Sequence, residues 1–243
     1  MRECHRFIRL ANQTLVPPII TVVLFILIFG YALGSRISSI QGVSYMQFLI
    51  PGLVMMTVIN SAYSNTSSSL YIARFQGSIQ ELLVSSMSNL ETVLAFVLGG
   101  VLRGLCVGAI VIVIATFLAD ITIVHVGATF FFILVVAFIF SCAGFITALW
   151  AEDFDRLSLF QNYVLTPLTY LGGVFFSVDN LPPVWKAVAM ANPILYFVNG
   201  LRFGFLGITD VPLAAATVIC LFVATGAFVL CFLLYRAGYN LKT

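Results

Sequence analysis

Long apolar stretches, divided by short polar segments, make up most of this chain. Six of them reach the length of about 20 residues that a helix needs to cross a bilayer. They are continuously apolar and therefore predict helices, because the strands of a transmembrane barrel would alternate apolar and polar residues. The six predicted spans are residues 15–34, 45–71, 92–119, 126–150, 157–177 and 211–235. The pattern predicts an all-α integral membrane protein that forms one transmembrane domain over residues 1–243.

A different pattern follows the fifth span. Two short aromatic-rich segments come after a pair of prolines and divide at an Asn-Pro pair. Neither segment is long and apolar enough to cross a bilayer. We therefore predict a re-entrant helical hairpin over residues 181–207. The residues that mark it are Pro182, Pro183, Trp185, Asn192, Pro193, Tyr196, Arg202 and Phe203.

Two other segments have the spacing of amphipathic helices. Over residues 1–13, Arg2, Arg6 and Arg9 share one helical face, which predicts a helix lying on an anionic membrane surface. A plain basic flank of the first span is the alternative. Residues 77–87 predict a short helix that presses either on a partner or on lipid head groups. Its face consists of Ile79, Leu82, Leu83 and Ser86, with Gln80 and Glu81 beside that face.

Several polar and small residues interrupt the apolar spans. Asn60, Ser64 and Ser67 follow helical spacing in the second span, and they face either a transport pathway or a neighbouring helix. In the third span, Gly100 and Gly104 begin a ridge of small residues that allows close helix packing. Arg103 lies within that ridge. A cation at this depth either serves a function or extends toward the cytoplasm.

Composition and charge agree with a membrane protein and orient it. The chain is 61% hydrophobic and only 8% charged, against about 25% charged residues in a soluble domain. Basic residues favour the cytoplasmic side of a membrane. The segments on the side of the two termini hold Arg2, Arg6, Arg9, Arg74, Arg156, Arg236 and Lys242, whereas the other side holds Arg36, Lys186 and Arg202. Both termini are therefore predicted to be cytoplasmic and the hairpin to be external.

The sequence argues against enzymatic and ion-coupled mechanisms. It has no G-x-x-x-x-G-K-[ST] motif and no H-E-x-x-H motif, so we expect no catalytic or metal site in this chain. The net charge of +2 does not suggest a nucleic-acid partner. All nine carboxylates fall in loops or at span ends, whereas ion-coupled carriers typically use ionisable groups inside the membrane. If the chain moves a solute uphill, we expect the energy to come from outside the membrane.

Four motifs carry a resemblance that covers essentially the whole chain. They are LVPPIITVVLF from Leu15, SYMQFLIPGLVMM from Ser44, IQELLVSSMSNLE from Ile79, and LTPLTYLGGVFFSVDNLPPVWKAVAMANPILYFVNGLRFGFLG from Leu165. With these motifs the chain resembles an ABC type-2 transport permease, the membrane subunit of a bacterial ATP-driven exporter.

The resemblance implies an assembly and a role for each predicted segment. Two copies of the permease would join two ATP-binding-cassette ATPase chains in the inner membrane. ATP and Mg would bind to the ATPase, and no cofactor would bind to this chain. Residues 77–87 would be the coupling helix that docks on the ATPase, residues 1–13 the connecting helix, and residues 181–207 the outer gate. Substrates of the family include polysaccharides, lipid-linked molecules and hydrophobic or amphiphilic compounds.

Two alternatives differ in how the chain would work. An ion-coupled carrier or channel would need no ATPase. A membrane enzyme that acts on lipid would need reactive groups at the interface, and residues 151–156 (AEDFDR) are the one candidate segment.

Overall fold

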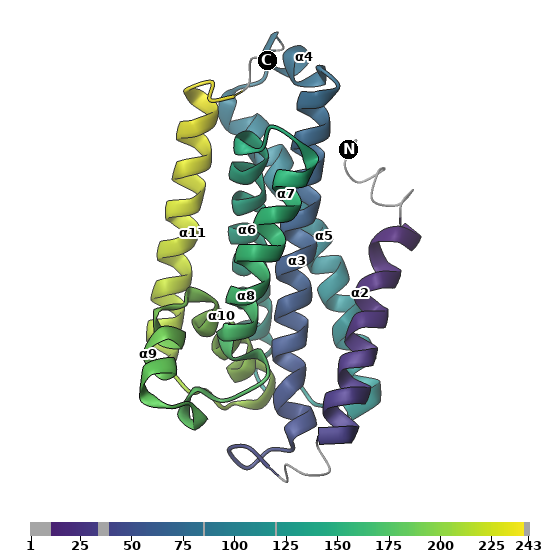
Figure 1. The fold of residues 1–243 in the computed structure, drawn as a ribbon, viewed down its shortest axis with the longest axis vertical. Helices are drawn as coiled ribbons and strands as arrows, with labels where there is room; N and C mark the ends of the chain where they lie inside the picture. The colour runs from purple at the N-terminus through teal and green to yellow at the C-terminus, as the bar shows by residue number, and fades with distance from the viewer. Residues whose placement is uncertain (1–10, 34–38, 85, 120, 241–243) are drawn as a thin grey trace.

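The computed structural model describes residues 11–33, 39–84, 86–119 and 121–240, and within this part of the chain it contains helices but no β-strand. The long helices run side by side along one axis (Figure 1). Four are long and apolar enough to cross a membrane: α3 (Tyr45–Phe75), α5 (Asn89–Ala119), α6 (Val126–Trp150) and α11 (Leu213–Arg236). The prediction of an all-α membrane protein is therefore confirmed.

Two other predicted spans form helices with changes in hydrogen-bond register. α2 (Ala11–Phe25) continues into the π-helix η1 (Ile26–Leu33). After α6, helical structure begins with α7 (Phe154–Phe160). It then continues without a gap through η2 (Gln161–Leu165), α8 (Thr166–Thr169) and η3 (Tyr170–Val174).

The change in register within this second helical run occurs next to a proline. Pro167 has no N–H and cannot bond to a carbonyl one turn earlier, which is a common cause of such interruptions. The run ends where Gly173 takes φ +75°, a left-handed conformation that glycine adopts at little cost.

The predicted hairpin forms two helices. After the short 3₁₀ turn η4 (Val178–Asn180) come α9 (Pro183–Ala191) and α10 (Pro193–Leu206). Asn192 divides them, because its side-chain oxygen accepts a hydrogen bond from the Ile194 N–H at 3.0 Å and so caps α10. α9 and α10 lie at the end of the bundle opposite α4 (Ser78–Val84), as Figure 1 shows.

The helix α3 lies at the centre of the bundle. Its most apolar 18-residue window is 83% buried, whereas the corresponding window of α11 is only 17% buried. α5 and α6 approach α3 closely through glycines. A Cβ on Gly100 would overlap Thr66 Oγ1 and lie 2.5 Å from Ser141 Oγ, and one on Gly144 would lie 2.5 Å from the Tyr63 carbonyl oxygen. The small side chains therefore set the spacing of the three central helices.

Substitution of Gly100 by Ala tests this packing. We expect Gly100→Ala to lower the free energy of unfolding by about 1–3 kcal/mol, since overpacking displaces neighbouring atoms. Gly226→Ala is the matched control: Gly226 lies within α11, and a Cβ at this position would meet no atom within 4 Å. There the higher helix propensity of Ala should increase stability by up to about 1 kcal/mol. Thermal unfolding of the purified proteins in detergent measures both effects, and equal shifts would contradict the packing argument.

Candidate functional site

Arg202 on α10 is fully buried, with none of its surface exposed. Its Nη2 donates to the Gly173 carbonyl oxygen at 2.7 Å, and its Nη1 donates to Asn199 Oδ1 at 3.3 Å. The guanidinium carbon lies 3.8 Å from the centroid of the Phe48 ring, which adds a cation–π contact. A buried cation is tolerated only with such partners, because its desolvation costs several kcal/mol.

The counter-ion of Arg202 is Asp210, whose side chain is also fully buried. Asp210 Oδ2 lies 3.6 Å from Arg202 Nη1 and accepts the Val178 N–H at 3.2 Å. Its Oδ1 accepts hydrogen bonds from Gln41 Nε2 at 2.6 Å and from Ser177 Oγ at 2.9 Å. Burial lowers the pKa of the Arg202 guanidinium to about 10, and the Asp210 carboxylate opposes this shift. Arg202 is therefore still charged at neutral pH.

This group, which we call the ionic cluster, consists of Arg202, Asp210, Asn199, Ser177 and Phe48. It joins α10, the loop before α11, the segment after η3 and the first turns of α3. Two bonds nearby strengthen the same junction: Tyr45 OH donates to the Phe175 carbonyl, and Asn192 Nδ2 donates to the Leu168 carbonyl. The hairpin is thus tied to both α3 and the helical run that precedes it.

The residues predicted as an outer gate take different positions within the hairpin. Trp185 on α9 is 55% exposed, and the prolines Pro182 and Pro183 begin that helix at the surface. On α10, Tyr196 OH donates to the Met190 carbonyl, and Phe203 stacks on His125 at 4.7 Å between ring centroids.

One of these residues has partners that the sequence did not indicate. Arg202, which is predicted on the external side, is buried within the protein and paired with Asp210. α10 packs so closely on α6 that a Cβ on Gly200 would overlap the Phe132 ring. α10 is therefore a buried helix of the bundle, whereas α9 is at the surface. Sequence reasoning also missed Asp210 as a buried group; the signal available was its place eight residues after Arg202.

The opposite end of the bundle holds α4, within the predicted coupling segment. Ile79 is buried and Gln80 is exposed. The helix ends at Val84, so Ser86 lies beyond it and not on its face. The chain turns there into the cap of α5, in which the Ser88 N–H and hydroxyl donate to the Glu91 carboxylate at 2.7 and 2.9 Å. The side chains of Glu81, Leu82 and Leu83, and the predicted residues Arg2, Arg6 and Arg9, lie outside the described part of the structure.

Arg74, near the end of α3, anchors this end of the bundle. Its Nη1 donates to the carbonyls of Ala148, Leu149 and Ala151 at the end of α6. A cation here binds the carbonyls that an α-helix leaves without partners. α4 follows after a turn at Gly77 and is held by a hydrogen bond from Ser78 Oγ to the Ala73 carbonyl at 3.2 Å. α4 is thus attached to α3, which is in turn bonded to α6.

In the middle of the bundle, α3 makes polar contacts with its neighbours. Gln161 of η2 donates to Asn60 Oδ1 at 3.4 Å and accepts from Ser64 Oγ at 3.4 Å. Ser67 is buried and donates to the Ser64 carbonyl of its own helix. Arg103 on α5 donates to Asn65 Oδ1 at 3.4 Å, so its side chain reaches sideways to α3. Gln161 and Asn65 were not predicted as members of this group.

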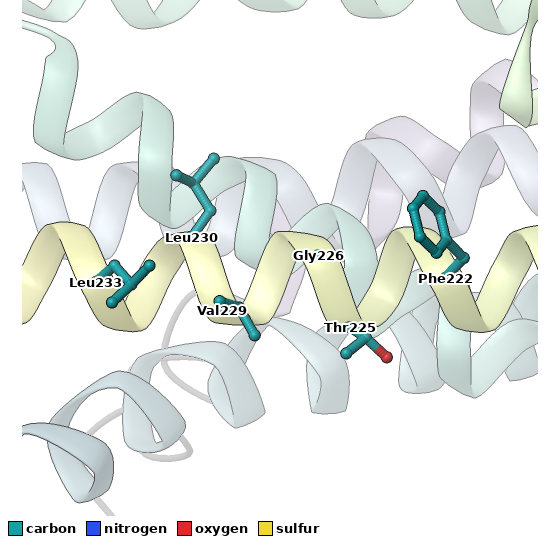
Figure 2. A pocket seen from close by; sticks show the side chains of 6 residues that line it. All are labelled: Phe222, Thr225, Gly226, Val229, Leu230 and Leu233. Carbon is teal, nitrogen blue, oxygen red and sulfur yellow. The ribbon is translucent and has the colours of Figure 1, made fainter.

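A shallow apolar groove of about 320 Å³ lies along one helix, α11. Figure 2 shows the six residues that line it: Phe222, Thr225, Gly226, Val229, Leu230 and Leu233. Gly226 carries no side chain and leaves the gap between its larger neighbours. An exposed apolar surface of this kind suits contact with lipid chains.

The fold and these sites define the class of protein: a multi-pass helical membrane protein in which polar side chains bond one helix to another. The family model for the ABC-2 type transporter matches residues 1–206 of the chain. This protein belongs to the ABC-2 type transporter family, and the resemblance seen in its motifs is confirmed.

The relatives of this chain include one whose name refers to transport. The chain is 44% identical to the inner membrane transport permease YadH of Escherichia coli K12 over 245 residues, which covers 100% of this chain and 94% of that protein. It is 25% identical to nodulation protein J of Rhizobium leguminosarum bv. viciae over 192 residues, with 76% of this chain and 72% of that protein covered. Nodulation protein J of Neorhizobium galegae is 22% identical over 231 residues, or 94% of this chain and 88% of that protein.

The ionic cluster predicts a contrast between two ion pairs. Arg202→Met leaves the buried Asp210 without its counter-ion and should destabilise the protein by about 3–5 kcal/mol. Lys186→Met breaks the Lys186–Asp179 pair, whose N–O distance of 2.8 Å is shorter but whose side chains are exposed. Its loss should lower the free energy of unfolding by no more than about 1 kcal/mol. Thermal unfolding in detergent compares the two.

A second variant separates the lost pairing from the changed shape of residue 202. In the double variant Arg202→Met/Asp210→Asn, the buried charge is gone, so part of the stability lost in Arg202→Met should return. A double variant less stable than Arg202→Met would contradict the role of Asp210 as counter-ion.

Proposed function

We propose that this chain is the membrane subunit of an ATP-driven exporter and is powered by a separate ATPase. The observation that carries the proposal is the attachment of α4. This short helix lies at one end of the bundle, where Ser78 and the buried Ile79 hold it against α3 and Arg74 bonds α3 to α6. A push on α4 would therefore move the central helices as a unit, as rigid-body coupling requires.

In the proposed topology the chain crosses the membrane six times, with both termini in the cytoplasm of a bacterial cell and the chain in its inner membrane. Four spans are the long apolar helices. The runs from Ala11 to Leu33 and from Phe154 to Val174 would supply the other two, since each extends roughly 30 Å at 1.5 Å per residue. α4 would then face the cytoplasm, and α9 and α10 the outside. The name of YadH, an inner membrane transport permease, supports the proposed location of the chain in the inner membrane.

The proposed assembly has two copies of this chain and two ATP-binding-cassette ATPase chains, which would bind ATP and Mg. Six helices of this size hardly enclose a wide pathway alone, and a two-fold pair is the commonest symmetric arrangement. The ATPase would dock on α4 through residues 79–83, and residues 1–13 would lie on the inner membrane surface. α9 and α10 would close the pathway on the outside, where the ionic cluster holds α10 to α3. The cargo would be a hydrophobic or amphiphilic compound, a lipid-linked molecule or a polysaccharide.

An ion-coupled carrier is the second candidate, and one observation favours it: the buried carboxylate of Asp210. Five other Asp and Glu residues have a described exposure, and all five are exposed: Glu91, Glu152, Asp153, Asp155 and Asp179. However, Asp210 is already neutralised by Arg202 and accepts three hydrogen bonds. A carboxylate with these partners is poorly suited to binding and releasing a coupling ion, so we prefer the ATP-driven mechanism.

Charge reversal in α4 tests the coupling. The measurement is the ATP hydrolysis activity that co-purifies with the tagged chain from native membranes. Glu81→Arg should lower this activity about tenfold, which corresponds to a loss of roughly 1.4 kcal/mol in docking free energy. Glu152→Arg is the matched control, since Glu152 is an exposed acid of the other predicted cytoplasmic loop. It should leave co-purified hydrolysis unchanged. Equal hydrolysis in Glu81→Arg and the unsubstituted chain would rule out docking through this residue.

A further inference from the structure

The surface of α3 has an unusual composition where it emerges from the bundle. Between residues 48 and 70 every residue is buried except four, and all four are Asn or Ser. They are Asn60, Ser64, Asn65 and Ser68, which are partly exposed. We call these four residues the polar strip. No apolar side chain of this part of α3 reaches the surface.

The position of the polar strip makes its exposure informative. Asn60 lies 15 residues after the start of α3 at Tyr45, or roughly 22 Å along the helix axis. Ser68 lies seven residues before the end at Phe75, or roughly 10 Å. The strip is therefore inside the hydrocarbon layer in the proposed topology. Polar groups at that depth are disfavoured against lipid chains, and they occur where they contact protein or line a water-filled cavity.

The strip has a polar group on each side. Gln161 bonds to Asn60 and Ser64 on one side, and Arg103 bonds to Asn65 on the other. These six residues offer amides, hydroxyls and one guanidinium, and none of the six carries a carboxylate. Guanidinium groups bind phosphate and carboxylate oxygens by charge-assisted hydrogen bonds, and amide and hydroxyl donors add to such a site.

We propose that the polar strip and Arg103 bind the acidic head group of an amphiphilic molecule during transport. This inference rests on the proposed function, and it selects one class among the possible cargoes. The head group, a phosphate or a carboxylate, would lie along α3 between η2 and α5. The apolar tail would remain among lipid chains. A neutral or cationic head group would gain less from Arg103.

The test measures how accessible the strip is to water in membrane vesicles that contain the full chain. Ser64→Cys is labelled with the anionic reagent sulfonatoethyl methanethiosulfonate and with its cationic trimethylammonium analogue. The unsubstituted chain supplies the background from its own cysteines. Thr225→Cys is the matched control, because Thr225 is a small exposed hydroxyl residue in the apolar groove of α11.

We expect the anionic reagent to label Ser64→Cys about tenfold faster than Thr225→Cys, since only the strip contacts water. Arg103→Gln should lower the ratio of the anionic to the cationic labelling rate of Ser64→Cys about fivefold. This change corresponds to roughly 1 kcal/mol of interaction with one nearby charge. Arg103→Lys should preserve that ratio. Sub-micellar decyl phosphate should slow the labelling of Ser64→Cys, whereas decyl maltoside should not, and Arg103→Gln should abolish the protection.

Three results would overturn the inference. Labelling of Ser64→Cys as slow as that of Thr225→Cys would mean that lipid covers the strip. Spontaneous disulfide cross-links between copies through Ser64→Cys would mean that a second copy covers it. Equal protection by decyl phosphate and decyl maltoside would mean that the strip is wet but does not select an acidic group. None of these measurements depends on ATP hydrolysis. Failure of the proposed coupling, seen as unchanged hydrolysis in Glu81→Arg, is therefore distinguishable from failure of this inference.

Discussion

The burial of Arg202 is the interaction on which one end of this structure depends. A guanidinium inside the bundle needs partners, and those of Arg202 come from segments far apart in the sequence: Gly173, Asp210 and Phe48. Arg202 on α10 therefore holds three segments together: the loop before α11, the end of η3 and the first turns of α3.

The helix α3 connects this end to the other. Its first turns contact Arg202 through Phe48, and its last turn carries Arg74, which bonds to the end of α6 beside α4. Between these points it is almost entirely buried, and glycines of α5 and α6 pack on it. A stiff, closely packed helix transmits displacement better than a loose one, because packed interiors resist compression. In the proposed exporter, α3 would carry motion from the ATPase side to the hairpin.

Much of the fold could be predicted from the chain alone. Apolar length identified the helices α3, α5, α6 and α11, and the break at Asn192-Pro193 identified the division between α9 and α10. The glycine spacing around Gly100 indicated close packing. The partners of charged residues could not be predicted in this way. The sequence placed Asp210 in a loop and Arg202 on the external side, but it did not indicate that the two pair, because the pairing depends on how α10 folds back against α3.

The sequence by itself determined that the chain is a helical membrane protein. Long apolar segments favour the bilayer, and a backbone within the bilayer must satisfy its hydrogen bonds internally, as a helix does. The sequence also determined the family, through motifs that extend along the chain. Only the tertiary structure decided which polar residues meet: Asp210 with Arg202, Arg74 with the end of α6, and Gln161 with Asn60. The physical reason is that helical spacing specifies the face on which a side chain lies. What that face contacts depends on the packing of all the helices together.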